Sequence, residues 1–158
     1  MNVISGLPAH VLLVHAIVVL APLTAVLEIL CGLWPAARRR LVWLVLALAA
    51  VTTALTPLTT EAGKWLLDRL QFSNDMLRTH AERGDWMIAF SGALLVGALA
   101  LAVLHWLEGR GDQPRRSARA VVAMVALVVG VSAIVGVVRI GDSGARAVWD
   151  GVVSNSVP

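Results

Sequence analysis

The sequence predicts an all-α, polytopic membrane protein whose 158 residues form one domain, a bundle of four transmembrane helices. The composition is 58% hydrophobic and only 15% charged, and the mean hydropathy is +0.80. A soluble domain of this size cannot bury so much apolar surface. The apolar residues fall into four runs of the length that crosses a bilayer core of about 30 Å. Because a helix satisfies every backbone group within its own segment, each run is expected to be a helix.

The four spans are expected at residues 11–34, 41–60, 86–107 and 120–138, with an outer loop at 61–85. Pro8 suits the first turn of the first helix, where its missing N–H costs nothing. Tryptophans fall near the expected span ends, as in the aromatic belts of membrane proteins. They are Trp34, Trp43, Trp65, Trp86 and Trp106.

Short interfacial helices are expected on the outer side, in addition to the spans. "EAGKWLLDRL" in the outer loop places apolar residues near one helical face, which is typical of a helix lying at the membrane surface. Asn74 or Asp75 can cap an early start of the third helix. Gly141 and Gly144 are expected to end the fourth span, which leaves "ARAVW" as a second short amphipathic segment.

Basic residues in short connections predict the orientation. The connections after the first and third spans hold Arg38, Arg39, Arg40, Arg110, Arg115, Arg116 and Arg119. The other six basic residues lie in the acid-containing outer loop and in the tail. The positive-inside rule therefore predicts a multi-pass protein of the bacterial cytoplasmic (inner) membrane with both termini outside the cytoplasm.

Several function classes are disfavoured by composition. The basic residues form no face with interleaved aromatics, so nucleic acid is not an expected partner. Cys31 is the only cysteine, which excludes an internal disulfide and a cysteine-held cluster. "GDSG" at 141–144 is also found in the nucleophile loop of trypsin-like proteases, but here it follows a membrane helix. No motif in the chain predicts an enzyme.

Ionisable residues gather at the expected outer end of the bundle. His10 and His15 begin the first span, and His80 precedes the third. The surrounding candidates are Thr60, Glu61, Lys64, Asp85, Arg139 and Asp142. Ionisable groups within or beside a membrane are costly, so their default interpretation is functional. The alternatives are an interfacial His10, a His15 bonded to a neighbouring helix and a solvent-exposed His80.

Helix geometry limits what these histidines can bind. Five residues at about 100° each put His10 and His15 some 140° apart, so a straight helix cannot aim both at one small ion. A zinc site would use one of them with His80 and Glu61. A b-type haem is larger and can take one imidazole from the first helix and another from the third.

A second polar pair is expected at the inner end. Glu28 is the only carboxylate well inside a span, and it lies five turns below His10 on the same helical face. His105 is at a similar depth, beside Trp106. We therefore expect a contact between Glu28 and His105 that neutralises both.

Four stretches resemble the bacterial membrane family catalogued as domain of unknown function 2231. They are "LPAHVLLVH", "TTEAGKWL", the histidine His80 and "GDSGARAVW". The resemblance implies a four-helix integral membrane domain that relatives sometimes join to a Rieske-type iron–sulfur domain, and hence redox work or haem. Where relatives often have histidine, this chain has Asp142.

The leading functional hypothesis is a membrane subunit whose outer histidines bind a metal centre, with b-type haem ahead of zinc or another metal, in a redox or accessory role. The alternative is a structural or assembly protein without a cofactor. A weaker alternative is a small-solute or proton transporter. The expected partners are the lipid bilayer and either further copies of the chain or a redox protein.

Overall fold

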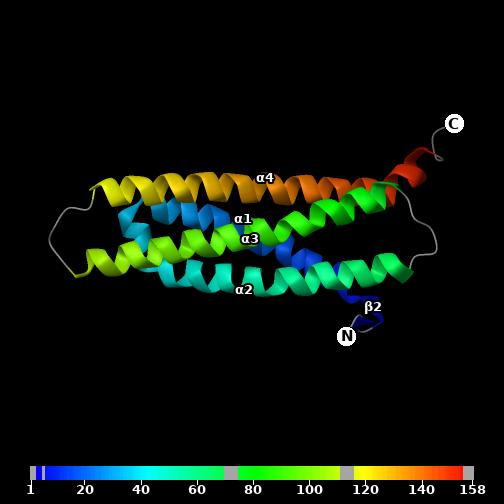
Figure 1. The fold of residues 1–158 in the computed structure, drawn as a ribbon, viewed down its shortest axis with the longest axis horizontal. Coiled ribbons are helices and arrows are strands. Elements are labelled where there is room, and N and C mark those ends of the chain that lie inside the picture. The colour runs from blue at the N-terminus through cyan, green and yellow to red at the C-terminus, as the bar shows by residue number, and fades with distance from the viewer. Residues whose placement is uncertain (1–2, 5, 70–74, 111–115, 155–158) are drawn as a thin grey trace.

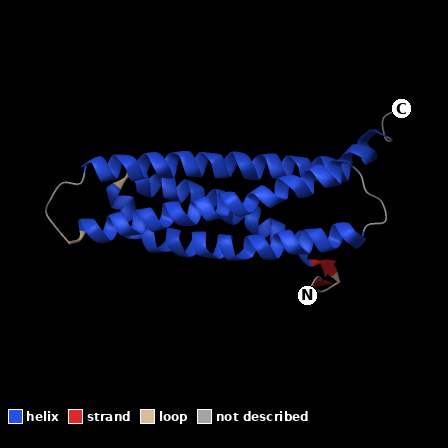
Figure 2. Ribbon diagram, viewed as in Figure 1, coloured by secondary structure: helices blue, strands red, loops and turns tan. Residues whose placement is uncertain are grey.

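The computed structural model describes residues 3–4, 6–69, 75–110 and 116–154. Two antiparallel strands of two residues each, β1 (Val3–Ile4) and β2 (Leu7–Pro8), precede four long helices. The helices are α1 (Ala9–Leu33), α2 (Pro35–Arg69), α3 (Asp75–Glu108) and α4 (Arg116–Ser154). Figures 1 and 2 show them as one antiparallel bundle. All four are long and apolar enough to cross a membrane.

The helices form a ring in which each packs against its sequence neighbours, and α4 closes the ring on α1. The diagonal pair α1 and α3 touches much less. The first turns of α1 and α3 and the last turns of α2 and α4 lie at one end of the bundle (Figure 1), which we name the histidine end because His10 and His80 are there. The opposite end, where α1 and α3 end and α2 and α4 begin, is named the arginine end.

Small side chains line the helix contacts, which lets the backbones approach closely as in other membrane bundles. Ala21, Ala25 and Ala133 are fully buried between α1 and α4, together with Leu94 of α3. A second cluster nearer the arginine end centres on residues of α2 and α3: Val42, Val45, Ala49, Ala98 and Leu101. Many large apolar side chains outside these clusters are exposed on the helix faces, where lipid would cover them.

The outer loop differs from its expected form. Helix α2 continues without a break to Arg69, so "EAGKWLLDR" extends this helix and forms no separate interfacial one. Helix α3 begins early, at Asp75, as expected. The capping prediction stays a prediction, because Asn74 lies outside the described residues. Helix α4 likewise runs through Gly141 and Gly144 to Ser154. A glycine ends a helix only if the chain turns there. Gly144 packs against the His80 ring within the helix, whereas a Cβ at Gly141 would meet nothing within 4 Å.

Candidate functional site

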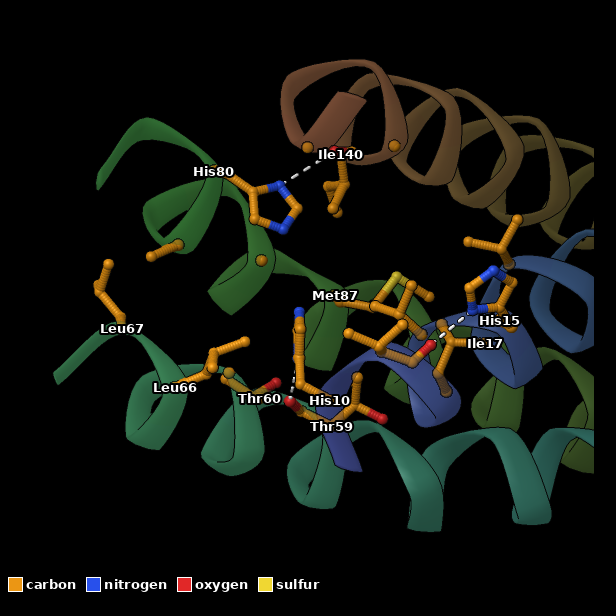
Figure 3. A pocket seen from close by; sticks show the side chains of 18 of the residues that line it. His10, His15, Ile17, Thr59, Thr60, Leu66, Leu67, His80, Met87 and Ile140 are labelled. Atoms are coloured by element: carbon orange, nitrogen blue, oxygen red, sulfur yellow. Dashed lines mark hydrogen bonds between the residues drawn. The ribbon is translucent and has the colours of Figure 1, made fainter. Parts of the chain in front are cut away.

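A cavity of about 620 Å³ opens between all four helices at the histidine end. Its lining is mainly aliphatic, and all three histidines of the outer cluster contribute to it. Thr60 and Lys64 of α2 are the other candidates that line it. Figure 3 shows His10 and His80 projecting into this cavity from α1 and α3. Two helices that begin 66 residues apart are thus brought together at one site.

His10 is held by α2. Its Nδ1–H donates a hydrogen bond of 2.9 Å to the carbonyl oxygen of Thr59. The carbonyl accepts only, so this bond places the proton on Nδ1 and leaves the lone pair on Nε2. Gly63 lies behind the ring, and a Cβ at this position would come within 2.9 Å of the imidazole. The ring therefore fits only because residue 63 has no side chain.

His80 is held by α4 in the same manner. Its Nδ1 lies 3.2 Å from the carbonyl oxygen of Ile140 and 3.1 Å from Oγ of Ser143. The Ser143 hydroxyl donates to the same Ile140 carbonyl at 2.7 Å, so its oxygen is oriented to accept from Nδ1–H. Gly144 backs this ring, since a Cβ there would meet it at 3.0 Å. His80 is thus also protonated on Nδ1, with Nε2 free.

The two imidazoles face each other across the cavity. Their ring centroids are 6.4 Å apart and their planes make an angle of 75°. Figure 3 shows a ring nitrogen of each directed toward the other ring, while the opposite nitrogen of each is bonded to the backbone. The site therefore directs two ring nitrogens, from different helices, into the cavity with a gap between them.

His15 is placed differently. It is exposed, and its Nδ1–H bonds to the Val11 carbonyl of its own helix. It lines the cavity but lies to the side of the facing pair (Figure 3). Glu61 is exposed and does not line the cavity. Over the described residues no three His, Cys, Asp or Glu side chains could hold a metal ion, so the three-ligand zinc site with Glu61 is not formed.

The remaining outer candidates lie at the rim or beyond it. Lys64 forms an ion pair of 3.2 Å with Asp85, both half exposed. Asp142 pairs with Arg146 one turn away on α4, at 3.0 Å, and is directed to this partner. Arg139 is exposed.

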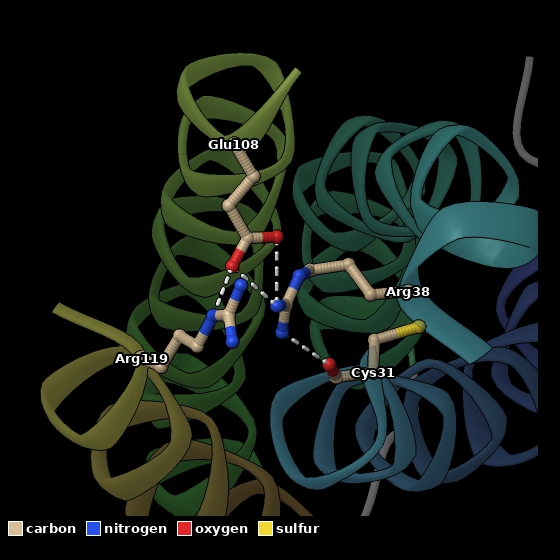
Figure 4. A network of polar contacts seen from close by, with 4 residues as sticks. All are labelled: Cys31, Arg38, Glu108 and Arg119. Atoms are coloured by element: carbon tan, nitrogen blue, oxygen red, sulfur yellow. Dashed lines mark hydrogen bonds and ion pairs between the residues drawn. The ribbon is translucent and has the colours of Figure 1, made fainter. Parts of the chain in front are cut away.

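Sequence reasoning missed a buried ionic network at the arginine end (Figure 4). Arg38, only 1% exposed, donates to both carboxylate oxygens of Glu108 at 2.9 Å and to the Cys31 carbonyl at 2.9 Å. Arg119 of α4 bonds to the same carboxylate. Arg38, the first arginine of the "RRR" run, therefore joins α1, α2 and α3. From the sequence, this run indicates only the orientation of the protein in the membrane.

The expected pairing of Glu28 with His105 is wrong. Glu28 is fully buried between α1 and α3, and among the described residues neither carboxylate oxygen has a hydrogen-bond partner. Its carboxylate sits against Gly97, where a Cβ would meet Oε2 at 2.9 Å. His105 instead packs its ring against Trp43, with centroids 6.3 Å apart. Equal depth in the membrane did not bring the two together because His105 turns toward α2.

Other site residues that sequence reasoning missed are the supports of the histidines: Thr59, Gly63, Ser143 and Gly144. A signal for them is present in the sequence, because Thr59 and Gly63 lie within "TTEAGKWL" and the other two lie within "GDSGARAVW". These two motifs hold His10 and His80 respectively. The structure thus gives both family motifs a structural role.

A comparison with protein families gives one match over almost the whole chain. A family model described as "Predicted membrane protein (DUF2231)" matches residues 6–156. No curated protein and no solved structure matches the chain. The matched range includes all four helices and both histidines of the facing pair. The chain therefore belongs to this family of predicted membrane proteins, DUF2231.

Proposed function

We propose that the protein is a membrane cytochrome-like subunit that binds one b-type haem between His10 and His80 and passes electrons at the histidine end. The observation that carries the proposal is the facing pair of imidazoles, each with its Nδ1–H bonded to backbone and its Nε2 directed into the cavity. Haem supplies one-electron chemistry that the chain itself lacks.

The tautomers support ligation. A metal-binding histidine almost always donates its other N–H to a carbonyl or carboxylate, which fixes the ring and raises the basicity of the ligating nitrogen. His10 has this arrangement with Thr59, and His80 has it with Ile140 and Ser143. Rings that served only for packing would have no need of such matched support from two different helices.

The spacing also fits. Two imidazoles on opposite sides of one metal, each about 2 Å from it through nitrogen, have ring centroids roughly 6 Å apart. The observed separation is 6.4 Å. The ligands come from two helices of a bundle, as expected for a cofactor held inside a four-helix protein.

The cavity suits a flat, apolar group with acidic substituents. Its volume lies within the range of small-molecule sites, and its lining is mainly aliphatic. Gly84 and Gly141 face open space in it, since a Cβ at either would meet nothing within 4 Å. A macrocycle can therefore approach the backbone of α3 and α4. Lys64 at the rim would exchange its half-exposed ion pair with Asp85 for one with a haem carboxylate.

The two histidines would both hold the haem, His10 from α1 and His80 from α3. A haem held by two protein side chains would supply electron transfer, and not activation of oxygen or of a substrate.

For the orientation, we propose that the histidine end lies outside the cytoplasm of a bacterial inner membrane. The density of arginines at the other end supports this. The electron partner would then be extracytoplasmic or within the membrane. Reporter fusions at the C-terminus test the orientation: alkaline phosphatase should be active there, and a cytoplasmic fluorescent reporter should be dark.

The haem content of detergent-purified protein, produced with haem available, tests the function. We expect about one haem per chain, lost in both His10→Ala and His80→Ala. His15→Ala and His105→Ala are the matched controls and should keep the haem. Absence of haem from folded wild-type protein would favour a structural or assembly role, and a spectrum unchanged by either ligand variant would refute the site.

A further inference from the structure

A second hollow lies at the arginine end, far from the histidine cavity. It has a volume of about 440 Å³ and is lined by residues of α2, α3 and α4 together with Gly109 and Arg110. Three guanidinium groups surround it, those of Arg39, Arg110 and Arg119. We name it the arginine groove.

The groove carries a net positive charge. Its one carboxylate, Glu108, is bonded by Arg38 from within the bundle and by Arg119 at the groove. The negative charge of Glu108 is therefore already balanced by Arg38 and Arg119. Within the described part of the chain, Arg39 and Arg110 form no ion pair. These two guanidiniums remain available to an anion.

The groove is also at the depth of lipid headgroups. Trp43 and Trp106 border it with 59% and 50% of their surfaces exposed, and exposed indoles mark the membrane–water interface. Arg110 stacks on Trp106, with its guanidinium carbon 3.6 Å from the ring centroid, which holds the charge over the groove. Leu44 and Val103, close by in sequence on the same two helices, are also exposed.

We propose that the arginine groove binds the phosphate headgroup of one anionic phospholipid, whose acyl chains lie along the exposed apolar faces of α2 and α3. Basic hollows between transmembrane helices bind such headgroups. A free phosphate ion would use the same arginines but would gain nothing from the indoles or from the apolar surface beside them. The combination of charge and apolar surface therefore favours a lipid.

The test is lipid retention, measured by native mass spectrometry on protein extracted from bilayers of phosphatidylcholine with a minority of phosphatidylglycerol. We expect one phosphatidylglycerol to stay bound to the wild type. The double variant Arg39→Gln/Arg110→Gln should bind it about 30-fold more weakly, since two interfacial arginine charges are removed. The matched control Arg78→Gln/Arg146→Gln removes two exposed arginines at the histidine end and should retain the lipid.

Two further measurements keep the result decisive. Helix content and the midpoint of thermal unfolding in pure phosphatidylcholine should be the same for the groove variant and its control, which excludes misfolding as the cause of lipid loss. Inorganic phosphate added alone should neither stabilise the protein nor displace the lipid. Equal retention by both double variants, no retained lipid on the wild type, or displacement by inorganic phosphate would each overturn the proposal.

Discussion

Replacement of Gly63 by alanine tests the support of His10 directly. The new Cβ would lie 2.9 Å from two atoms of the His10 ring, whereas ordinary contacts begin at about 3.4 Å. The ring must move away, and its 2.9 Å bond to the Thr59 carbonyl restrains it. Overpacking costs about 1–3 kcal/mol and the weakened hydrogen bond about 1 kcal/mol, whereas alanine in a helix gains up to about 1 kcal/mol over glycine. The clash outweighs the gain.

We therefore expect Gly63→Ala to reduce the free energy of unfolding by about 1–3 kcal/mol and to lower the unfolding midpoint by about 2–12 °C. Haem retention should fall as well, because the ligand ring is displaced. The assay is thermal unfolding in detergent followed by circular dichroism, with haem absorbance measured on the same sample. Gly92→Ala is the control, since a Cβ there meets nothing within 4 Å. A Gly63→Ala protein at least as stable as Gly92→Ala would refute the reasoning.

Two other substitutions test the interior of the bundle by the same unfolding assay. Arg38→Met removes one partner of a buried pair and should cost about 3 kcal/mol, because Glu108 loses the guanidinium that bonds both of its oxygens. Lys64→Met breaks the half-exposed pair with Asp85 and should reduce the free energy of unfolding by less than about 1 kcal/mol. Equal reductions in Arg38→Met and Lys64→Met would contradict the claim that the buried pair matters more. Glu28→Met removes a carboxyl that has no partner among the described residues and should raise stability by about 2–3 kcal/mol. A loss of stability in Glu28→Met would show that the carboxyl has a partner or a role.

The fold was largely predictable because lipid imposes one strong rule. Any apolar run of about 20 residues must become a helix, and four such runs make a bundle. The ends of the helices were harder to predict. Residues 61–69 and 139–154 are polar enough to suggest loops, yet α2 and α4 continue through them because their inner faces pack around the cavity.

The site was predictable in part. The geometric argument that His10 and His15 cannot share one ion agrees with the structure, which places them to different sides. The same argument left open which of the two meets His80, because that depends on the rotation of α1 against its neighbours. This rotation is fixed by close contacts between helices, such as the contact of Gly63 with the His10 ring. Helical periodicity in the sequence does not predict such contacts. The Arg38 network could not be predicted either, because a run of basic residues at the start of a helix is typical of a solvated turn.

The most direct test of the central claim is the electron paramagnetic resonance spectrum of the oxidised, haem-loaded protein. Two imidazole ligands whose planes stand at 75° predict a low-spin ferric signal with the strong anisotropy of nearly perpendicular axial rings. The signal should become high-spin in His80→Ala and remain low-spin in His15→Ala. A high-spin wild type, or a low-spin signal that survives His80→Ala, would contradict ligation by His10 and His80.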